Sequence, residues 1–515
     1  MFLTLLIACS GSPDPVALDG ELLFVRDGVI APSGPGVSTP AGVVVSRPWT
    51  PGESVELAGL TATAPARAEC VRLFSEDLGD VSRLIAMGGA APNTTLAFSP
   101  DGSKLAVGSY RGELLVLDGF SGAVLARRSL AETMVKQVTW AADGQTLYAA
   151  EQSPDAMLYA LDPGSLEPRW TLRMADFVGT SSPPAAEDLY GVYTLPGVYT
   201  LVVLPSGALL VSALHSWDRD GVKTNRSQIL RVSPAGEVLD RWPEEPADAT
   251  FQHVDVDAEG GIMAVTVNRS ADGDPPAGLP IGGVMLLDID GLTPLLPVIT
   301  EPLAPWFTDT FIWNGLSVSR ADDALFMGFG DGRVRLLSLS GEERLSLTTG
   351  APILAGEVPI HASVGWGGVY NSRLVYNTSA TLIPYGAADP SLRPPTAHPG
   401  ENTLWSVALT GGVQWSWSGP QRIEGLTFAD DGQHLVVGAG DRKTDDRRDL
   451  YGALVFSLAD DARSGAERLE AFCQTEGPVF FRQAIAADGR IALAEHPYMD
   501  GTGAIHGAYR VTVLR

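Results

Sequence analysis

The chain has 515 residues, of which 45% are hydrophobic and 19% are charged, so it can bury a large core and is not disordered as a whole. Its 35 Lys and Arg residues against 61 Asp and Glu residues give a formal net charge of -26, which argues against nucleic acid and anionic membrane surfaces as partners. The 57 glycines and 37 prolines favour many short strands joined by turns, and therefore an all-β fold.

The first nine residues, MFLTLLIAC, form an apolar run that ends in Leu6-Ile7-Ala8-Cys9. This run resembles the lipobox of bacterial lipoproteins, and the resemblance implies cleavage before Cys9 and lipid modification of that residue. Residues 10–19 would then be a tether, and Ser10 in place of Asp implies the outer membrane. No Lys or Arg precedes the run, which is short for a signal peptide, so we expect a start upstream; the alternative is a chance apolar terminus.

Residues 20–69 contain three strand-like runs, ELLFVRDG, GVVVSRP and SVELAGL, separated by turn-rich segments. They predict either a small β-module or an extension of the fold that follows. The next run, CVRLFSEDLGDVSRLIAM from Cys70, has the pattern of outer strands, and we expect it to complete the last repeat of the chain. Cys70 and Cys473 form an even pair in an exported chain and predict a disulfide; the alternative is two buried thiols.

From residue 94 onward one pattern recurs: an apolar run, a tight turn, a second apolar run, a variable loop and a third run. Its clearest copy is FSPDGSKLAVGSYRGELLVLD at residues 98–118, where Asp-Gly marks the hairpin turn. Further copies start at Val138, Leu201, Val254, Leu316, Ala362, Leu426 and Ala484. A fourth strand is also visible, as in GAVLARRSL from Gly122.

A four-stranded unit cannot cover both of its apolar faces alone, so such units stack radially and close a ring. The sequence therefore predicts an eight-bladed β-propeller of four-stranded antiparallel blades over residues 70–515, with seven blades as the alternative. Its N- and C-terminal strands would close the ring in one blade.

The repeats resemble two kinds of bacterial propeller. FSPDGSKLAVGS resembles WD40-like repeats, while LYALDPGSLEPRW and LWSVALTGGVQW resemble the tryptophan-docking repeats of quinoprotein-type (PQQ-like) propellers. The resemblance implies the fold but not the activity, because such propellers include enzymes, outer-membrane assembly lipoproteins and scaffolds. The adjacent Cys-Cys pair of quinoprotein dehydrogenases is missing, so we do not expect alcohol oxidation.

Five connections between second and third strands are long, and in a propeller these emerge on one face together with the connections into the next blade. Insertions on one face of a repeat fold usually mark the binding face. The five span residues 214–228, 268–283, 377–402, 439–452 and 495–508. The predicted binding-face residues within them are His215, Trp217, Asp218, Asp220, Tyr385, Arg447, Arg448, Tyr451, His496, Tyr498 and His506.

A metal site is a second prediction. His253 and Asp255 lie on one side of a predicted inner strand, and His361 begins an equivalent strand. Neutral imidazole and carboxylate are ligands for zinc or manganese, so these three could hold one divalent ion at the channel mouth. The alternative is that His253 and Asp255 form hydrogen bonds to neighbouring strands, with Asp257 in a turn. The acidic loops around Asp218 and Asp445 lack a complete calcium-binding pattern and favour solvated loops.

Nucleophile elbows, phosphate-binding loops, zinc-protease motifs and dinucleotide fingerprints are missing from the sequence, which favours a protein that is not an enzyme. We therefore expect a lipid-anchored propeller of the bacterial envelope that binds a protein, peptide or glycan and needs no cofactor. The alternative is a metal-dependent hydrolase of the lactonase type, with His253, Asp255 and His361 activating water.

Overall fold

The computed structural model describes residues 44–45, 54–55, 70, 72–79, 94–131, 133–183, 191–219, 222–269, 279, 282–299, 312–330, 332–355, 358–379, 398–429, 432–440, 443–444, 451–459, 465–480, 483–500 and 502–515. Some of the residues singled out above lie outside this set, namely Leu6, Ile7, Ala8, Cys9, Ser10, Asp220, Tyr385, Asp445, Arg447 and Arg448. Within it, no helix has the length and apolar character needed to cross a membrane.

The stretch that begins at Thr95 folds into one sheet of four antiparallel strands. They are β4 (Thr95–Phe98), β5 (Lys104–Gly108), β6 (Glu113–Asp118) and β7 (Val124–Ser129), side by side in chain order. The Asp101 carboxylate closes the first turn by accepting bonds from Ser99 Oγ at 2.6 Å and Ser103 N at 3.0 Å, and Gly102 has φ +69°. These bonds, led by that from Ser99, hold the pKa of Asp101 at about 2. The Asp-Gly turn thus forms as the sequence predicts.

The four-strand order recurs along the rest of the chain. The second and third units are β8 (Met134–Trp140), β9 (Leu147–Gln152), β10 (Met157–Leu161) and β11 (Pro168–Arg173), then β12 (Gly197–Val203), β13 (Leu209–Arg219), β14 (Val222–Val232) and β15 (Val238–Ala247). The fourth and fifth are β17 (Val254–Asp257), β18 (Ile262–Arg269), β19 (Gly282–Asp288) and β20 (Thr293–Ile299), then β21 (Ile312–Ser319), β22 (Ala324–Phe329), β23 (Arg333–Leu337) and β24 (Glu343–Thr349).

The sixth and seventh units are β27 (Ser363–Tyr370), β28 (Arg373–Ser379), β29 (Thr403–Ala408) and β30 (Val413–Ser418), then β31 (Ile423–Phe428), β32 (His434–Ala439), β34 (Gly452–Ser457) and β35 (Leu469–Gln474). The eighth is β36 (Ala484–Ile485), β37 (Ile491–Glu495), β40 (Arg510–Leu514) and β3 (Arg72–Asp77). These are the units found in the described residues; the number of blades in the propeller stays a prediction.

Smaller elements complete the described chain. They are β16 (Ala249–Thr250), β25 (Ile353–Ala355), β26 (Val358–Ile360), β33 (Lys443–Thr444), β38 (Tyr498–Asp500), β39 (Ile505–His506), α4 (Ala175–Val178), η2 (Gly191–Thr194) and α5 (Gly465–Arg468). The first connection predicted as a long loop, residues 214–228, differs from expectation: β13 and β14 run through most of it as a long hairpin. The last, residues 495–508, contains β38 and β39.

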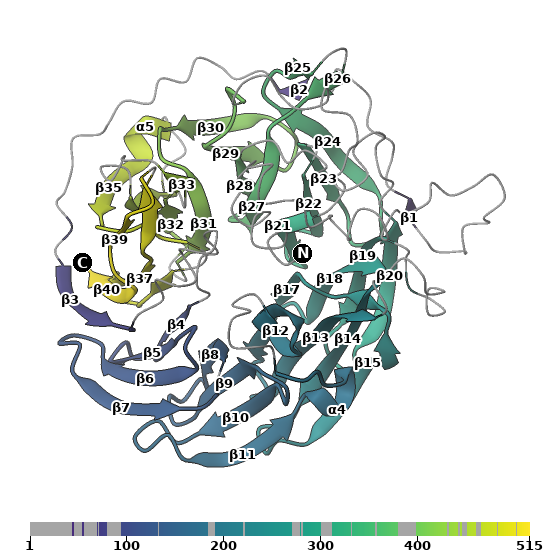
Figure 1. The fold of residues 1–515 in the computed structure, drawn as a ribbon. Coiled ribbons are helices and arrows are strands. Elements are labelled where there is room, and N and C mark those ends of the chain that lie inside the picture. The colour runs from purple at the N-terminus through teal and green to yellow at the C-terminus, as the bar shows by residue number, and fades with distance from the viewer. Residues whose placement is uncertain are drawn as a thin grey trace. The chain divides into compact units, whose positions relative to one another are not determined.

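By backbone contacts the chain divides into two compact parts, each larger than a single four-stranded unit. One comprises Met1–Ala62, Ser216–Ile229 and Asp240–Gly419, and the other Thr63–His215, Leu230–Leu239 and Pro420–Arg515. We call the first strand of each four-stranded unit its leading strand. In the first part of the chain, the leading strands β17, β21 and β27 contact one another in succession (Figure 1). In the second part, the leading strands β36, β4, β8 and β12 do so.

Side-chain oxygens on these leading strands accept hydrogen bonds from the backbone of the next four-stranded unit. Thr95 Oγ1 accepts from Val138 N at 3.3 Å, and Thr427 Oγ1 accepts from Gln483 N at 2.9 Å. Asp255 Oδ2 accepts from Val318 N at 2.8 Å. The same kind of bond therefore joins successive sheets at three separate places.

A strand from near residue 70 pairs with a strand from the end of the sequence. β3 is antiparallel to β40, and Ser75 Oγ lies 2.9 Å from Thr512 Oγ1 across the pair. Beside it, Cys70 and Cys473 form a disulfide, with Cα atoms 5.2 Å apart, within the range that the bond requires. Because Cys473 belongs to β35, the bond links the N-terminal strand segment to the neighbouring sheet.

Arg490 forms a further link between the eighth four-stranded unit and the first. Its side chain is 2% exposed and donates to the carbonyl of Gly119 and, at 2.8 Å, to the carbonyl of Gly102. The guanidinium also lies 3.8 Å from the centroid of the Phe120 ring. Both carbonyls belong to turns of the first sheet, so one cation satisfies two backbone acceptors.

The N-terminal segment 20–69 contributes two described strands, β1 (Val44–Val45) and β2 (Ser54–Val55). They pair in parallel with β20 and β24, the fourth strands of two successive units. These strands lie within the predicted runs GVVVSRP and SVELAGL, whereas ELLFVRDG lies outside the described residues. The described pairings therefore extend two sheets of the repeats.

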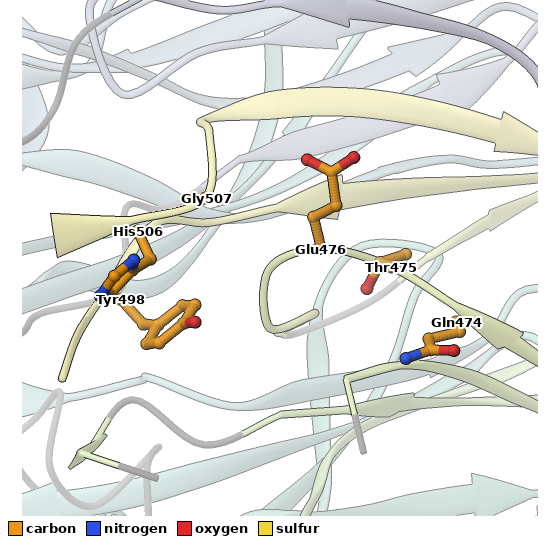
Figure 2. Close-up of a pocket in the computed structure, with 6 residues that line it drawn as sticks. All are labelled: Gln474, Thr475, Glu476, Tyr498, His506 and Gly507. Carbon is orange, nitrogen blue, oxygen red and sulfur yellow. The ribbon is translucent and has the colours of Figure 1, made fainter. Parts of the chain in front are cut away.

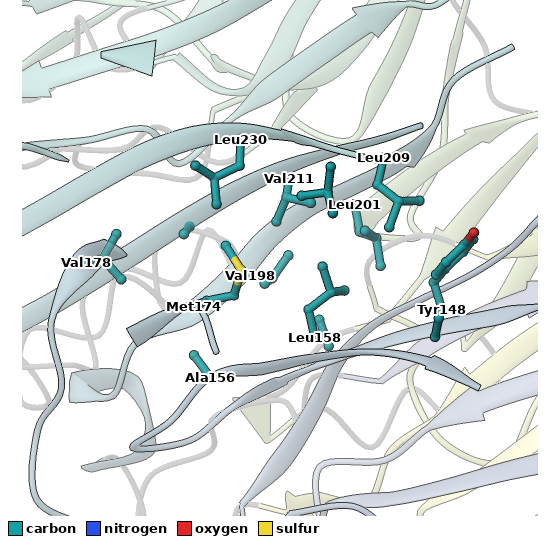
Figure 3. Close-up of a cluster of buried hydrophobic side chains, with 14 residues drawn as sticks. Tyr148, Ala156, Leu158, Met174, Val178, Val198, Leu201, Leu209, Val211 and Leu230 are labelled. Carbon is teal, nitrogen blue, oxygen red and sulfur yellow. The ribbon is translucent and has the colours of Figure 1, made fainter. Parts of the chain in front are cut away.

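The core consists of apolar side chains packed between sheets. One cluster gathers Leu158, Val211 and Leu230, each with no exposed surface, around Met174 and Val198 (Figure 3). Full burial of a Val or Leu side chain contributes about 1.5–3 kcal/mol, so a cluster of this kind is a main source of stability. It explains why the repeats show two apolar runs with few polar interruptions.

Candidate functional site

A partly open pocket of about 330 Å³ lies at the end of β35, beside the hairpin of β38 and β39. Its walls are formed by Gln474, Thr475, Glu476, Tyr498, His506 and Gly507 (Figure 2). These residues come from the connection that leads from β35 to the eighth sheet and from the connection between β37 and β40. The pocket is thus built by the two kinds of connection that the sequence assigned to one face.

The hairpin positions the aromatic wall of the pocket. Tyr498 lies opposite His506 in the antiparallel pair, and β33 adds a short parallel strand to β38. Gly507 has φ +77°, a conformation that favours glycine. A Cβ at Gly477 would lie 2.2 Å from the His496 carbonyl oxygen, so a glycine is required for this close approach.

Buried aromatic rings pack around the hairpin of β38 and β39. The ring centroids of Tyr498 and His506 are 5.4 Å apart and stacked, while Tyr451 meets Tyr498 edge to face at 5.2 Å. His496 has no exposed surface and lies against Phe480 at 5.3 Å. Such contacts contribute about 0.5–1.5 kcal/mol each beyond their burial, so the wall is held in place by packing.

The acidic side of the pocket is balanced by arginines. Glu495 is 1% exposed and accepts from Arg510 at 3.1 and 2.9 Å, which raises the pKa of that guanidinium. Glu476 is 63% exposed; its carboxylate lies 3.2 Å from Arg510 and 4.0 Å from Arg72. Its backbone N donates to Glu495 at 3.1 Å. The buried pair thus fixes the loop, while the Glu476 carboxylate remains accessible.

The pocket combines an aromatic wall with polar groups on the opposite side. The half-buried His506 ring offers flat apolar area, with the buried Tyr498 ring stacked behind it, and Gln474 and Glu476 can form hydrogen bonds. Thr475 is committed to the loop, since its hydroxyl donates to the Gly477 carbonyl at 2.7 Å. This composition suits recognition of a peptide or sugar by contact and hydrogen bonding.

The structure brings four of the predicted binding-face residues to this place. Tyr498 and His506 line the pocket, and Tyr451 packs against Tyr498. His496 adjoins the pocket loop through its carbonyl oxygen, which lies beside Gly477, while its ring contacts Phe480 and Tyr509. Four lining residues were not among the predicted binding-face residues. Gly507 lies within the predicted connection 495–508. Gln474 ends β35, and Thr475 and Glu476 follow it on the connection into the next unit, so this position was the signal that could have identified them.

Three other predicted residues lie in β13 rather than in a loop. His215 is 2% exposed, and its ring contacts Ser181 and the Val178 carbonyl. Trp217 is half-buried, with the Arg226 guanidinium 5.7 Å from its ring centroid. Asp218 also belongs to β13. The hairpin is a strand pair because its polar side chains are hydrogen-bonded: Ser216 Oγ donates to Asn225 at 2.7 Å.

The Asp255 carboxylate, one of the proposed metal ligands, has another partner. It accepts from Val318 N, while the backbone N of His253 donates to Thr266 Oγ1 at 3.1 Å. Asp257 accepts from Gly260 N at 2.8 Å in its turn, and also from Arg320 N of the next sheet at 2.7 Å. His361 is 4% exposed. No three His, Cys, Asp or Glu side chains among the described residues could hold a metal ion, and the metal site stays a prediction.

A second polar cluster lies at the ends of β8 and β9. Lys136 is buried, donates from Nζ to Gln152 at 2.7 Å and lies 3.9 Å from the Tyr199 ring centroid. Burial raises the pKa of the neighbouring Glu151 carboxyl to about 7, although the bond donated by Tyr159 at 2.6 Å offsets part of the rise.

Of three similar solved structures, the first supports the fold. The C-terminal WD40 domain of Sif2 shares 11% identity, with a TM-score of 0.51 over 87% of this chain and 99% of that domain. BamB from Moraxella catarrhalis gives 13% identity and a TM-score of 0.41, covering 74% and 97%. The computationally designed protein Ika8 gives 12% and 0.46, covering 82% and 98%. No known protein family and no curated protein matches the sequence.

The fold and the recurring antiparallel sheets define the class of protein: the chain has a WD40-like β-propeller fold. At 11% identity the likeness to the WD40 domain establishes the fold and no further property. Any activity must therefore be argued from the residues of the site.

Proposed function

We propose that this propeller is a binding or scaffold protein of the bacterial cell envelope, held at the outer membrane by lipid on Cys9. It takes a peptide or protein partner on the face that bears the pocket of Tyr498, His506 and Glu476. The observation that supports this role is the pocket itself, because two separate connections meet there and present aromatic and polar groups together.

The chemistry of the pocket favours a peptide segment over a small apolar ligand. Its wall is aromatic, its opposite side carries the accessible Glu476 carboxylate, and the chain as a whole has a net charge of -26. A segment with an aromatic or basic side chain would stack on the half-buried His506 ring and pair with Glu476. A glycan is the rival ligand, since sugar rings also stack on Tyr and His.

Site-specific photocrosslinking tests the binding face. A photoreactive amino acid in place of His506 should capture a partner in envelope preparations, identified by mass spectrometry. The matched control is the same replacement at His434, a histidine with 41% exposure at the start of β32, beside a short turn. Equal capture from both positions, or from neither, would contradict the proposal.

A purified partner then allows the affinity to be measured. Glu476→Ala should weaken binding by about 1 kcal/mol or more, because an accessible charge is lost from the pocket. Glu167→Ala, which removes another exposed carboxylate in a salt bridge, should leave the affinity unchanged. Competition by oligosaccharides but not by peptides would assign the pocket to glycans.

The anchor requires its own test. Cells that express the chain and receive an alkyne-bearing fatty acid should incorporate the label into the protein. Cys9→Ser should abolish both the label and membrane association, while Cys70→Ser should retain both. Label that persists in the Cys9→Ser variant would refute the lipobox assignment.

A further inference from the structure

A serine on the connection that follows the second four-stranded unit forms a hydrogen-bonded pair with a histidine of β13. Ser181 Oγ lies 2.5 Å from His215 Nε2, and Nδ1 of the same ring lies 3.1 Å from the carbonyl oxygen of Val178. A carbonyl only accepts, so Nδ1 carries the ring proton and donates it. Nε2 then carries no proton and accepts the hydrogen bond of the Ser181 hydroxyl.

The surrounding segment holds this pair in place. His215 is 2% exposed in β13, and Val178 ends the short helix α4. Thr180 Oγ1 donates to the Pro154 carbonyl at 2.6 Å, which anchors the residue before Ser181. Gly179 has φ +84°, a conformation that favours glycine where the chain turns from the helix towards Ser181. The base is therefore buried and oriented, while Ser181 is only half-buried.

Hydrogen-bond donors are also close to the serine. The backbone N–H groups of Ser181 and Ser182 donate no hydrogen bond in the part of the chain that the structure describes, and Ser182 is exposed. Backbone donors next to a nucleophile can stabilise the oxyanion that forms during acyl transfer. A nucleophile, a base, an orienting group and adjacent donors thus occur within one short segment and one strand.

We propose that Ser181 is a nucleophile activated by His215 and that it accepts acyl groups from small esters. Ser181 Oγ bonds to the ester carbonyl carbon as its proton passes to His215 Nε2. The tetrahedral intermediate expels the alkoxide, which takes that proton and leaves as an alcohol. Water then attacks the acyl-serine, again giving a proton to Nε2, and the acid leaves as Ser181 Oγ recovers it. This chemistry goes beyond partner binding and shares no residue with the pocket of Tyr498 and His506.

A fluorophosphonate probe tests the nucleophile, because it forms a phosphonyl-serine with loss of fluoride only at activated hydroxyls. The intact protein should be labelled at one site, which tandem mass spectrometry places at Ser181, at least 100-fold faster than heat-denatured protein. Ser181→Ala should lose the label. The adjacent control Ser182→Ala, which keeps the backbone N–H, should label at the original rate.

The pH dependence of the labelling rate tests the role of His215 in the unmodified protein. On the acid side, the labelling rate should fall tenfold per pH unit once the imidazole is protonated, because Nε2 then accepts no proton.

His215→Asn should reduce the labelling rate about 100-fold, and the melting temperature of this variant checks that it is folded. The proposal is overturned if Ser181→Ala labels like the original chain, or if the folded protein labels no faster than the denatured one.

Discussion

Removal of the Arg490 guanidinium should be among the most destabilising single changes in the described chain. Arg490→Met keeps a similar side-chain volume but leaves the carbonyls of Gly102 and Gly119 without their buried donor. Two charge-assisted bonds at about 1.5 kcal/mol each, and about 1 kcal/mol for the Phe120 contact, give an expected loss of about 4 kcal/mol. The Asp488 pair adds little, because that carboxylate is 47% exposed.

Urea unfolding followed by tryptophan fluorescence can measure this loss. The matched control is Arg169→Met, because Arg169 is 44% exposed and bonds to Asp162 at the surface. We expect a change of less than about 1 kcal/mol for that control. An Arg490→Met variant that lost no more than the Arg169 control would show that the two carbonyls find other donors, and would refute the assignment of Arg490 as a link between sheets.

Three further changes test other links. Replacing Cys70 and Cys473 by Ser together should lower stability by up to about 5 kcal/mol, seen as a lower melting temperature that no longer responds to reductant; an unchanged melting temperature would contradict a stabilising disulfide. Asp255→Ala should cost about 1–2 kcal/mol in urea unfolding through loss of the Val318 bond, whereas Asp255→Asn, which keeps an acceptor, should cost less; equal losses would refute that bond. The pKa of Glu151 is raised on folding, so stability should fall by up to about 3 kcal/mol as pH rises from 4.5 to about 7. Glu151→Gln should remove this dependence of stability on pH. If the dependence persisted in the variant, another group would be its cause.

Much of the fold could be predicted because each repeat is specified by residues that are close together in the sequence. The Asp-Gly pair at Asp101 forms its turn through the side chain of the aspartate and the positive φ of the glycine, and both depend on neighbouring residues alone. Apolar runs on either side then specify strands, since both faces of each sheet are covered. Local chemistry of this kind is visible in a single sequence.

The hairpin of β13 and β14 was predicted as a loop because its sequence is polar. In the structure, Ser227 and Gln228 are buried and hydrogen-bonded, with Ser227 Oγ donating to the Ala249 carbonyl at 2.8 Å. Partners this far along the chain cannot be read from a local pattern. The pocket shows the same limit: Tyr498 and His506 were predicted, but Glu476 required knowledge of which connections meet.

The pairing of β3 with β40 also sets an order of events during synthesis. Cys70 and Cys473 are 403 residues apart, and a ribosome adds about 5–20 residues per second. β3 is therefore synthesised about 20–80 s before its partner β40. During this time one edge of β3 can pair with any other extended chain. A factor that shields nascent strands would act in this interval, and slower translation or export would lengthen the exposure without altering the finished protein.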